Sequence, residues 1–170
     1  MSYERHNIKS VSKDLQKFVI NTPVLRFDII DSLCNCNVFF KCENFQHTGS
    51  FKYRAAINAI KKMPVEFKQT GVITHSSGNF AHALARAAYE LKIPCHIVMP
   101  NNTPNFKKSS VLSYTKNIIE CESNLKAREF TTSEILKNKN LYFIHPSNNM
   151  DVILGNSSCA VEFIIDYPNL

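Results

Sequence analysis

Two short stretches of this chain carry residues whose types and spacing could do chemistry. The first is Thr48-Gly49-Ser50-Phe51-Lys52, in which a lysine follows a glycine turn and opens an expected helix. An amine at a helix start lies at the positive end of the macrodipole, which disfavours its charged form. A lysine with a lowered pKa is a better nucleophile toward carbonyl compounds. The alternative is an ordinary solvated lysine, which is the commoner state of this residue.

The second stretch is Ser76-Ser77-Gly78-Asn79, a small polar turn. It follows a strand-like segment that contains Val72 and Ile73, and it precedes a helical pattern. A strand, a polar turn and a helix N-terminus together form a site for an anion such as a carboxylate or a phosphate. The alternative is a plain turn in which an asparagine caps the helix.

The elements around these stretches follow from hydrophobic spacing. We expect Ser50 to cap the lysine helix through its hydroxyl group and Pro64 to follow the end of that helix. The apolar stripe of this helix consists of Ala55, Ala56, Ile57, Ala59, Ile60 and Met63. The helix after the second turn has Phe80, Leu84, Ala87, Ala88 and Leu91 on one face.

Strands and helices alternate along the chain. We expect strands at residues 38–40, 72–73, 95–99, 117–121 and 141–144, and helices at 8–19, 51–63, 79–91, 106–114, 123–137 and 157–166. This alternation is typical of an α/β fold with a parallel sheet and right-handed crossovers. Ligands of such sheets bind beyond the carboxyl ends of the strands, where the turn 76–79 is expected.

Length and composition narrow the class of protein. The 170 residues suit one domain or parts of two, and a hydrophobic content of 44% is that of a globular protein. No apolar run is long enough to span a membrane, and residues 1–6 hold no apolar signal segment. We therefore expect a cytoplasmic protein with no membrane partner.

The charges and cysteines indicate no further class of site. The net charge is +6, but no basic motif interleaved with aromatic residues is present, so we expect no nucleic-acid partner. The six cysteines are scattered, and the C-x-C spacing of Cys34 and Cys36 has no matching second pair. We expect reduced thiols and no metal site.

Further motifs extend this pattern along nearly the whole chain. They are Asn21-Thr22-Pro23-Val24-Leu25, residues 39–52, the turn 76–79, Val98-Met99-Pro100, Lys107-Lys108, His145-Pro146 and Gly155. In this order and separation they resemble the fold-type II pyridoxal-phosphate enzymes. Within that class, the chain is most similar to the serine racemase and threonine (serine) dehydratase family, of which it resembles the N-terminal half only.

The resemblance implies a fold and a division of the chain. The expected fold is a three-layer, parallel-sheet small domain of the tryptophan synthase β-like kind, together with an incomplete large domain. Residues 1–50 would be the N-terminal part of the large domain, residues 51–150 the small α/β domain, and residues 151–170 the return into the large domain.

The resemblance also implies roles for individual residues. Lys52 matches the lysine that forms the Schiff base with pyridoxal 5'-phosphate and removes the α-proton of the substrate. Phe51 matches a residue that packs against the cofactor ring, and Asn79 matches the side chain that binds the ring hydroxyl. Ser77 matches the residue that faces the ring opposite the lysine, where racemases have serine and many dehydratases have alanine. The loop that binds the substrate carboxylate corresponds to Ser76, Ser77, Gly78 and Asn79.

The implied activity is racemisation or deamination of L-serine or L-threonine. The family usually has His where Phe80 stands, and the cysteine synthase branch has different residues around its lysine. The four glycines are Gly49, Gly71, Gly78 and Gly155, and no two are adjacent. The glycine-rich phosphate loop of the family would therefore come from elsewhere, such as a separately encoded C-terminal half. The resemblance implies that the partner of the pyridine nitrogen and the divalent-metal site come from that missing part as well.

Two functional hypotheses remain open at this point. The chain is part of such an enzyme, which is expected to be a homo-oligomer when complete. Alternatively, it is a non-catalytic remnant or regulatory module that keeps the small-domain fold.

Overall fold

The computed structural model describes residues 5–169, with side chains described from Ile8 onward. Residues 1–4, which belong to the segment checked for a signal sequence, and residue 170 lie outside this range. The helices are α1 (Arg5–Leu15), α2 (Asp28–Cys34), α3 (Lys52–Lys62), α4 (Asn79–Glu90), α5 (Asn105–Leu112), α6 (Leu125–Asn138) and α7 (Met150–Asp166). The strands are β1 (Val24–Leu25), β2 (Phe40–Lys41), β3 (Val72–His75), β4 (Cys95–Pro100), β5 (Asn117–Cys121) and β6 (Tyr142–Phe143). Short 3-10 helices are η1 (Glu43–Phe45), η2 (His47–Gly49) and η3 (Val65–Phe67).

Four strands form the predicted parallel sheet, in the order β5-β4-β3-β6. β3 lies at its centre and pairs in parallel with β4 and with β6. β5 extends the sheet by pairing with the far edge of β4. Because all four strands run the same way, their carboxyl ends meet at one edge, where β3 leads into the turn before α4.

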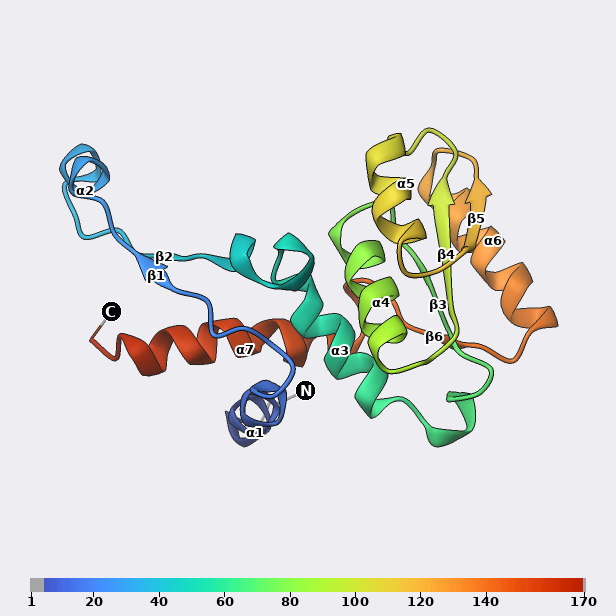
Figure 1. Ribbon diagram of the computed structural model, residues 1–170, viewed down its shortest axis with the longest axis horizontal. Coiled ribbons are helices and arrows are strands. Elements are labelled where there is room, and N and C mark those ends of the chain that lie inside the picture. Colours follow the sequence, from blue (N-terminus) through green and yellow to red (C-terminus); the bar gives the residue numbers. More distant parts are fainter. Residues whose placement is uncertain (1–4, 170) are drawn as a thin grey trace.

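Successive side chains of each strand point to opposite faces of the sheet, so the interior is divided into two cores. Ile73 and Val98 point to one face, where they pack with Leu141 and with side chains of α6. Val72 and Ile97 point to the other face and join the larger core of α3 and α4. Figure 1 shows α4 and α5 on one side of the sheet and α6 on the other. The expected three-layer α/β fold is therefore confirmed.

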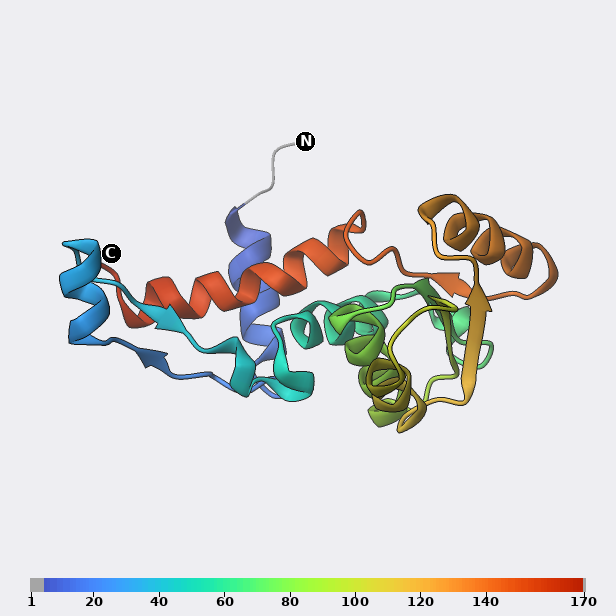
Figure 2. The ribbon, with the colours of Figure 1, turned by 90° about the horizontal axis from the view of Figure 1, so that it is seen from above.

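The rest of the chain extends away from this sheet. Figures 1 and 2 show α7 leaving the three-layer part as a long helix, with α1 crossing it. The antiparallel pair of β1 and β2 runs along the far part of α7 and ends at α2. α3 packs against α4 on one side and against α7 and α1 on the other, so it joins the two parts. No helix within residues 5–169 is long and apolar enough to cross a membrane.

Several predicted elements need correction. The C-terminal helix begins at Met150 rather than at residue 157. The strand expected at residues 38–40 lies at Phe40–Lys41, and the first helix ends at Leu15. β1 and α2 were not predicted at all, because a two-residue strand and a seven-residue helix are too short for a periodic pattern.

The lysine helix also differs from its prediction in two ways. Ser50 does not cap it: Phe51 is the N-cap residue without a side-chain bond, and the buried Ser50 hydroxyl has no partner in the described chain. Burial is not confined to a stripe either, since all eight residues from Tyr53 to Ile60 are buried. The helix is enclosed because α4, α7 and α1 surround it.

Candidate active site

The backbone before Lys52 is strained. Gly49 has φ 69°, in the left-handed region that glycine adopts readily. Thr48 also lies there, with φ 62° and ψ 13°, although it is β-branched. Its hydroxyl oxygen is buried without a partner in the described residues. Strain of this kind persists where the surrounding structure fixes it, which is common at functional sites.

Lys52 is the first residue of α3, and its side chain is half-buried. Burial lowers the pKa of its amine below the ordinary value. The pKa of Lys52 is thus lowered as expected, but the cause found is burial of the amine and not the helix macrodipole. The amine lies 4.8 Å from the centre of the Phe51 ring, and Lys52 forms no ion pair with the described residues. An amine that lacks a carboxylate partner and has a lowered pKa is suited to attack a carbonyl carbon.

The second predicted stretch forms the turn from β3 into α4. The backbone N–H of Ser76 donates to the carbonyl of Val98 at 3.0 Å, which ties the turn to the neighbouring strand. The N–H of Gly78 donates to the Ser76 Oγ at 3.4 Å. Gly78, not Asn79, is the N-cap residue, and no side chain caps α4. The alternative of a plain asparagine cap is therefore not what the structure shows.

The turn opens onto free space. A Cβ atom added at Gly78 would meet no atom within 4 Å. Asn79 is the first residue of α4 and is exposed, while Ser76 and Ser77 are half-buried. The first N–H groups of a helix lack partners within it, so this end of α4 can bind a carboxylate.

The fold brings the two stretches together. Both views show the turn between β3 and α4 beside the start of α3 (Figures 1 and 2). η2, which precedes Lys52, packs against α4. The helix start that carries Lys52 and the turn suited to a carboxylate thus lie side by side.

A histidine that was not predicted to have a role adjoins this turn. His75 ends β3, is buried, and has no partner for its Nδ1 in the described residues. Its ring lies 5.3 Å from that of His145, and both line a cavity of about 210 Å³ beneath α6. Burial lowers the pKa of His75, and the nearby His145 and Arg128 lower it further. The signal available in the sequence was its position directly before the polar turn.

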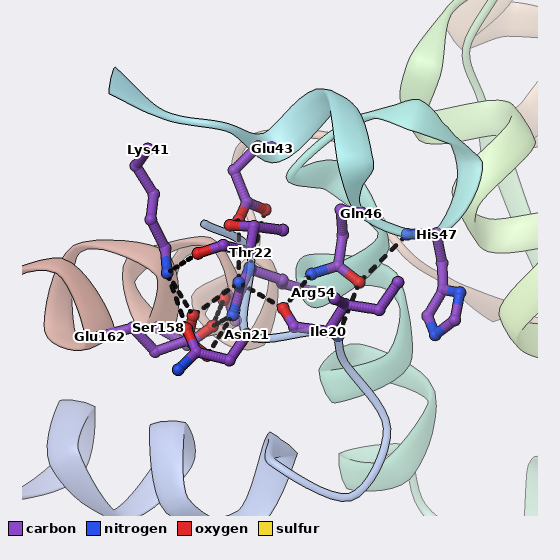
Figure 3. A network of polar contacts seen from close by, with 11 residues as sticks. Ile20, Asn21, Thr22, Lys41, Glu43, Gln46, His47, Arg54, Ser158 and Glu162 are labelled. Carbon is purple, nitrogen blue, oxygen red and sulfur yellow. Dashed lines mark hydrogen bonds and ion pairs between the residues drawn. The ribbon is translucent and has the colours of Figure 1, made fainter. Parts of the chain in front are cut away.

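A buried ionic network around Arg54 was also not predicted from the sequence. Figure 3 shows Arg54, two residues after Lys52, between the carboxylates of Glu43 and Glu162. Charged residues are rarely buried unless they are paired, so a single sequence gives no reason to expect Arg54 inside. No group of three or more His, Cys, Asp or Glu side chains suited to a metal ion occurs in the described part of the chain.

Comparisons with known proteins show what the whole chain is similar to. Residues 15–169 match the family described as pyridoxal-phosphate dependent enzyme. The chain is 37% identical over 164 residues to a serine racemase of Dictyostelium discoideum, covering 96% of this chain and 51% of the relative. It is 39% identical over 150 residues to a beta-hydroxyaspartate dehydratase of Paracoccus denitrificans, covering 88% of this chain and 48% of that relative. The structure of maize serine racemase matches with a TM-score of 0.92 at 35% identity, and the match covers 96% of this chain and 50% of the maize chain. The chain thus spans about half the length of these relatives.

Proposed function

Because this chain belongs to the family of pyridoxal-phosphate dependent enzymes, we propose that it carries the lysine-bearing half of an enzyme that racemises or deaminates L-serine or L-threonine. The observation that supports this most is the half-buried amine of Lys52, which has no ion-pair partner among the described residues and belongs to a helix whose start lies beside the turn between β3 and α4. Relatives named for racemisation and for dehydration are both similar to the chain, so the family includes both reactions.

The residues present fit the cofactor. The Lys52 amine can bind an aldehyde carbon, since no carboxylate of the described residues forms an ion pair with it. Phe51 is 40% exposed beside it, which leaves an aromatic face for a planar ring. We propose that Asn79 donates a hydrogen bond to the hydroxyl group of that ring. The cofactor, when bound, supplies an electron sink for negative charge at the substrate α-carbon.

The chain's own groups would then bind the substrate and move its protons. The open turn of Ser76, Ser77 and Gly78 would bind the substrate carboxylate through backbone N–H groups at the start of α4. Lys52 Nζ would remove the α-proton from one face, which its lowered pKa favours because more of the amine is unprotonated near neutral pH. Ser77 Oγ would return a proton on the opposite face, the step that racemisation needs and elimination does not.

We also propose that further polypeptide completes the large domain, for example a separately encoded C-terminal half, and that the complete enzyme is a homo-oligomer. Large apolar side chains are exposed on the part that would join it: Leu33 is 82% exposed, Ile164 63% and Ile165 67%. Monomeric proteins rarely leave such apolar surface uncovered. The alternative remains a non-catalytic remnant or regulatory module.

The test is to trap the cofactor on its lysine. We expect borohydride reduction in the presence of pyridoxal 5'-phosphate to place the pyridoxyl group on the peptide that contains Lys52. Lys52→Ala should abolish this labelling, whereas Lys61→Ala, at the exposed far end of the same helix, should not. Labelling that is unchanged in Lys52→Ala would contradict the assignment. Labelled chain that releases neither keto acid nor D-serine, even with a C-terminal half supplied, would favour the non-catalytic alternative.

A further inference from the structure

The most heavily paired side chain in the described structure adjoins the candidate lysine. Arg54 is fully buried, and its guanidinium group binds two carboxylates (Figure 3). Its Nε and Nη2 donate to Glu43 Oε2 and Oε1, each at 2.8 Å. Its Nη1 and Nη2 donate to Glu162 Oε1 and Oε2 at 2.7 and 2.8 Å. Two bidentate contacts of this kind fix the plane of the guanidinium group as well as its position.

The surrounding groups complete the network. Lys41 Nζ lies 3.0 Å from Glu162 Oε2, and the Thr22 hydroxyl donates to Glu43 Oε1 at 2.6 Å. The Ile20 carbonyl accepts from Arg54 Nη2 at 3.1 Å. Two cations and two carboxylates therefore balance one another. Burial opposes the charge of Arg54, but its bonds to both carboxylates raise its pKa overall.

A network of this kind is a costly way to gain stability. Burying ions carries a desolvation penalty that well-packed apolar side chains avoid. What the ions provide is a defined geometry, because Arg54 can sit in only one position between its two partners. Glu43 comes from η1 and Glu162 from α7, so the contacts hold α3 between two separate elements.

Two side chains anchor the first turn of α3: the Tyr53 hydroxyl donates to Glu90 of α4, and Arg54 binds its two carboxylates. No side chain caps the helix, and the Ser50 hydroxyl has no partner in the described chain. The N–H of Arg54 donates to the Phe51 carbonyl at 3.1 Å, so Arg54 closes the turn that contains Lys52. Movement of Arg54 would therefore be transmitted directly to Lys52.

We propose that Arg54 is a positioning residue for Lys52: held between Glu43 and Glu162, it fixes the first turn of α3 and keeps the Lys52 amine half-buried beside the turn 76–79. This inference rests on the proposed function for the use of that amine. The position of the amine can nevertheless be measured without the cofactor.

The test variant is Arg54→Lys, which keeps the charge and loses the planar fork. The matched control is Lys41→Met, which removes a cation from the same Glu162 carboxylate without altering α3. Lysine side chains are labelled by reductive methylation with ¹³C-formaldehyde, and the pKa of Lys52 is read from its NMR titration. Trapping of pyridoxal 5'-phosphate on Lys52 is measured on unmethylated samples of the same variants, because a dimethylated amine cannot form an imine, and circular dichroism gives the folded fraction.

We expect Arg54→Lys to raise the pKa of Lys52 toward that of a solvated lysine and to reduce trapping about tenfold, the effect of losing one charge-assisted hydrogen bond. Lys41→Met should change neither once corrected for folded fraction. An unchanged Lys52 pKa in folded Arg54→Lys, or equal shifts in both variants, would overturn the proposal. If Arg54→Lys fails to fold, Glu43→Gln loosens the same contact and is judged by the same two criteria. Absence of trapping in the unaltered protein would instead refute the proposed function, whatever the pKa of Lys52.

Discussion

Replacing Gly155 with alanine tests how closely α7 packs against the lysine-bearing helix. A Cβ atom at Gly155 would lie 2.6 Å from the Arg54 carbonyl oxygen, 2.7 Å from the Ala55 Cα and 2.9 Å from the Asn58 Cβ. The first two are main-chain atoms of α3, which cannot turn aside as a flexible side chain can. The two helices would therefore have to separate.

Two opposing effects set the expected magnitude. In the interior of an isolated helix, alanine is more favourable than glycine by about 1 kcal/mol. Forcing an extra carbon into a packed interior costs about 1–3 kcal/mol. Separation of the helices would also lengthen the contacts with Arg54 that Glu162 makes, about two turns farther along α7 than Gly155. We expect a net loss of about 1–2 kcal/mol, and each kcal/mol corresponds to about 2–4 °C in a chain of this size.

The assay is urea and thermal unfolding followed by circular dichroism. Ala160→Gly calibrates helix propensity in the same helix, since Ala160 is exposed and should lose about 1 kcal/mol. If the close approach of α7 and α3 is wrong, Gly155→Ala should stabilise the protein by about the amount that Ala160→Gly destabilises it. The sign of the change therefore decides the question.

Two further predictions concern the site itself. Because burial lowers the pKa of His75, unfolding exposes a group that binds a proton more readily, and stability should fall as pH drops below the unfolded pKa of about 6.5. The other charged and titratable groups that face this ring are His145, Arg128 and Glu129, and all three remain in His75→Gln. Between neutral pH and the pKa of His75 in the folded protein, the urea midpoint of the variant should therefore drop less than that of the unaltered protein. Parallel plots of urea midpoint against pH would contradict this. If the proposed function holds, Ser77→Ala in a completed enzyme should lose racemisation by about 10²–10⁴-fold and elimination far less, as measured by D-serine and keto-acid formation. Equal losses would remove Ser77 from the proton-return role.

The sheet could be predicted from the sequence because its signals are local. β5 was predicted with its observed bounds, and α4 ends one residue before its predicted end. These segments carry a regular apolar period between clear turns, and the family resemblance indicates the same order. α7 was predicted seven residues short because Gly155 and the polar residues after it are typical of a break in a helix. In the structure that glycine lies where α7 meets α3, so a long-range contact explains a residue that local propensity disfavours.

The candidate site could be predicted only in part, for a related reason. Lys52 and the turn 76–79 lie in compact motifs. Arg54, in contrast, binds Glu43, which is 11 residues away along the chain, and Glu162, which is 108 residues away. No periodic pattern links such positions, and their charges favour the surface when each is considered alone.

The lysine helix itself shows how the missing information could be recovered. A helix that is buried on every side is normally apolar on every side. Between Tyr53 and Ile60, however, α3 contains Arg54 and Asn58, and both find polar partners on α7. Asn58 donates to the Asp151 carbonyl, and Arg54 binds Glu162, eleven residues farther along α7 and therefore on nearly the same face. Two polar residues four apart in α3 thus bond to two positions eleven apart in α7. These two contacts specify how α7 lies against α3, and through Arg54 they determine where the first turn of α3 places Lys52.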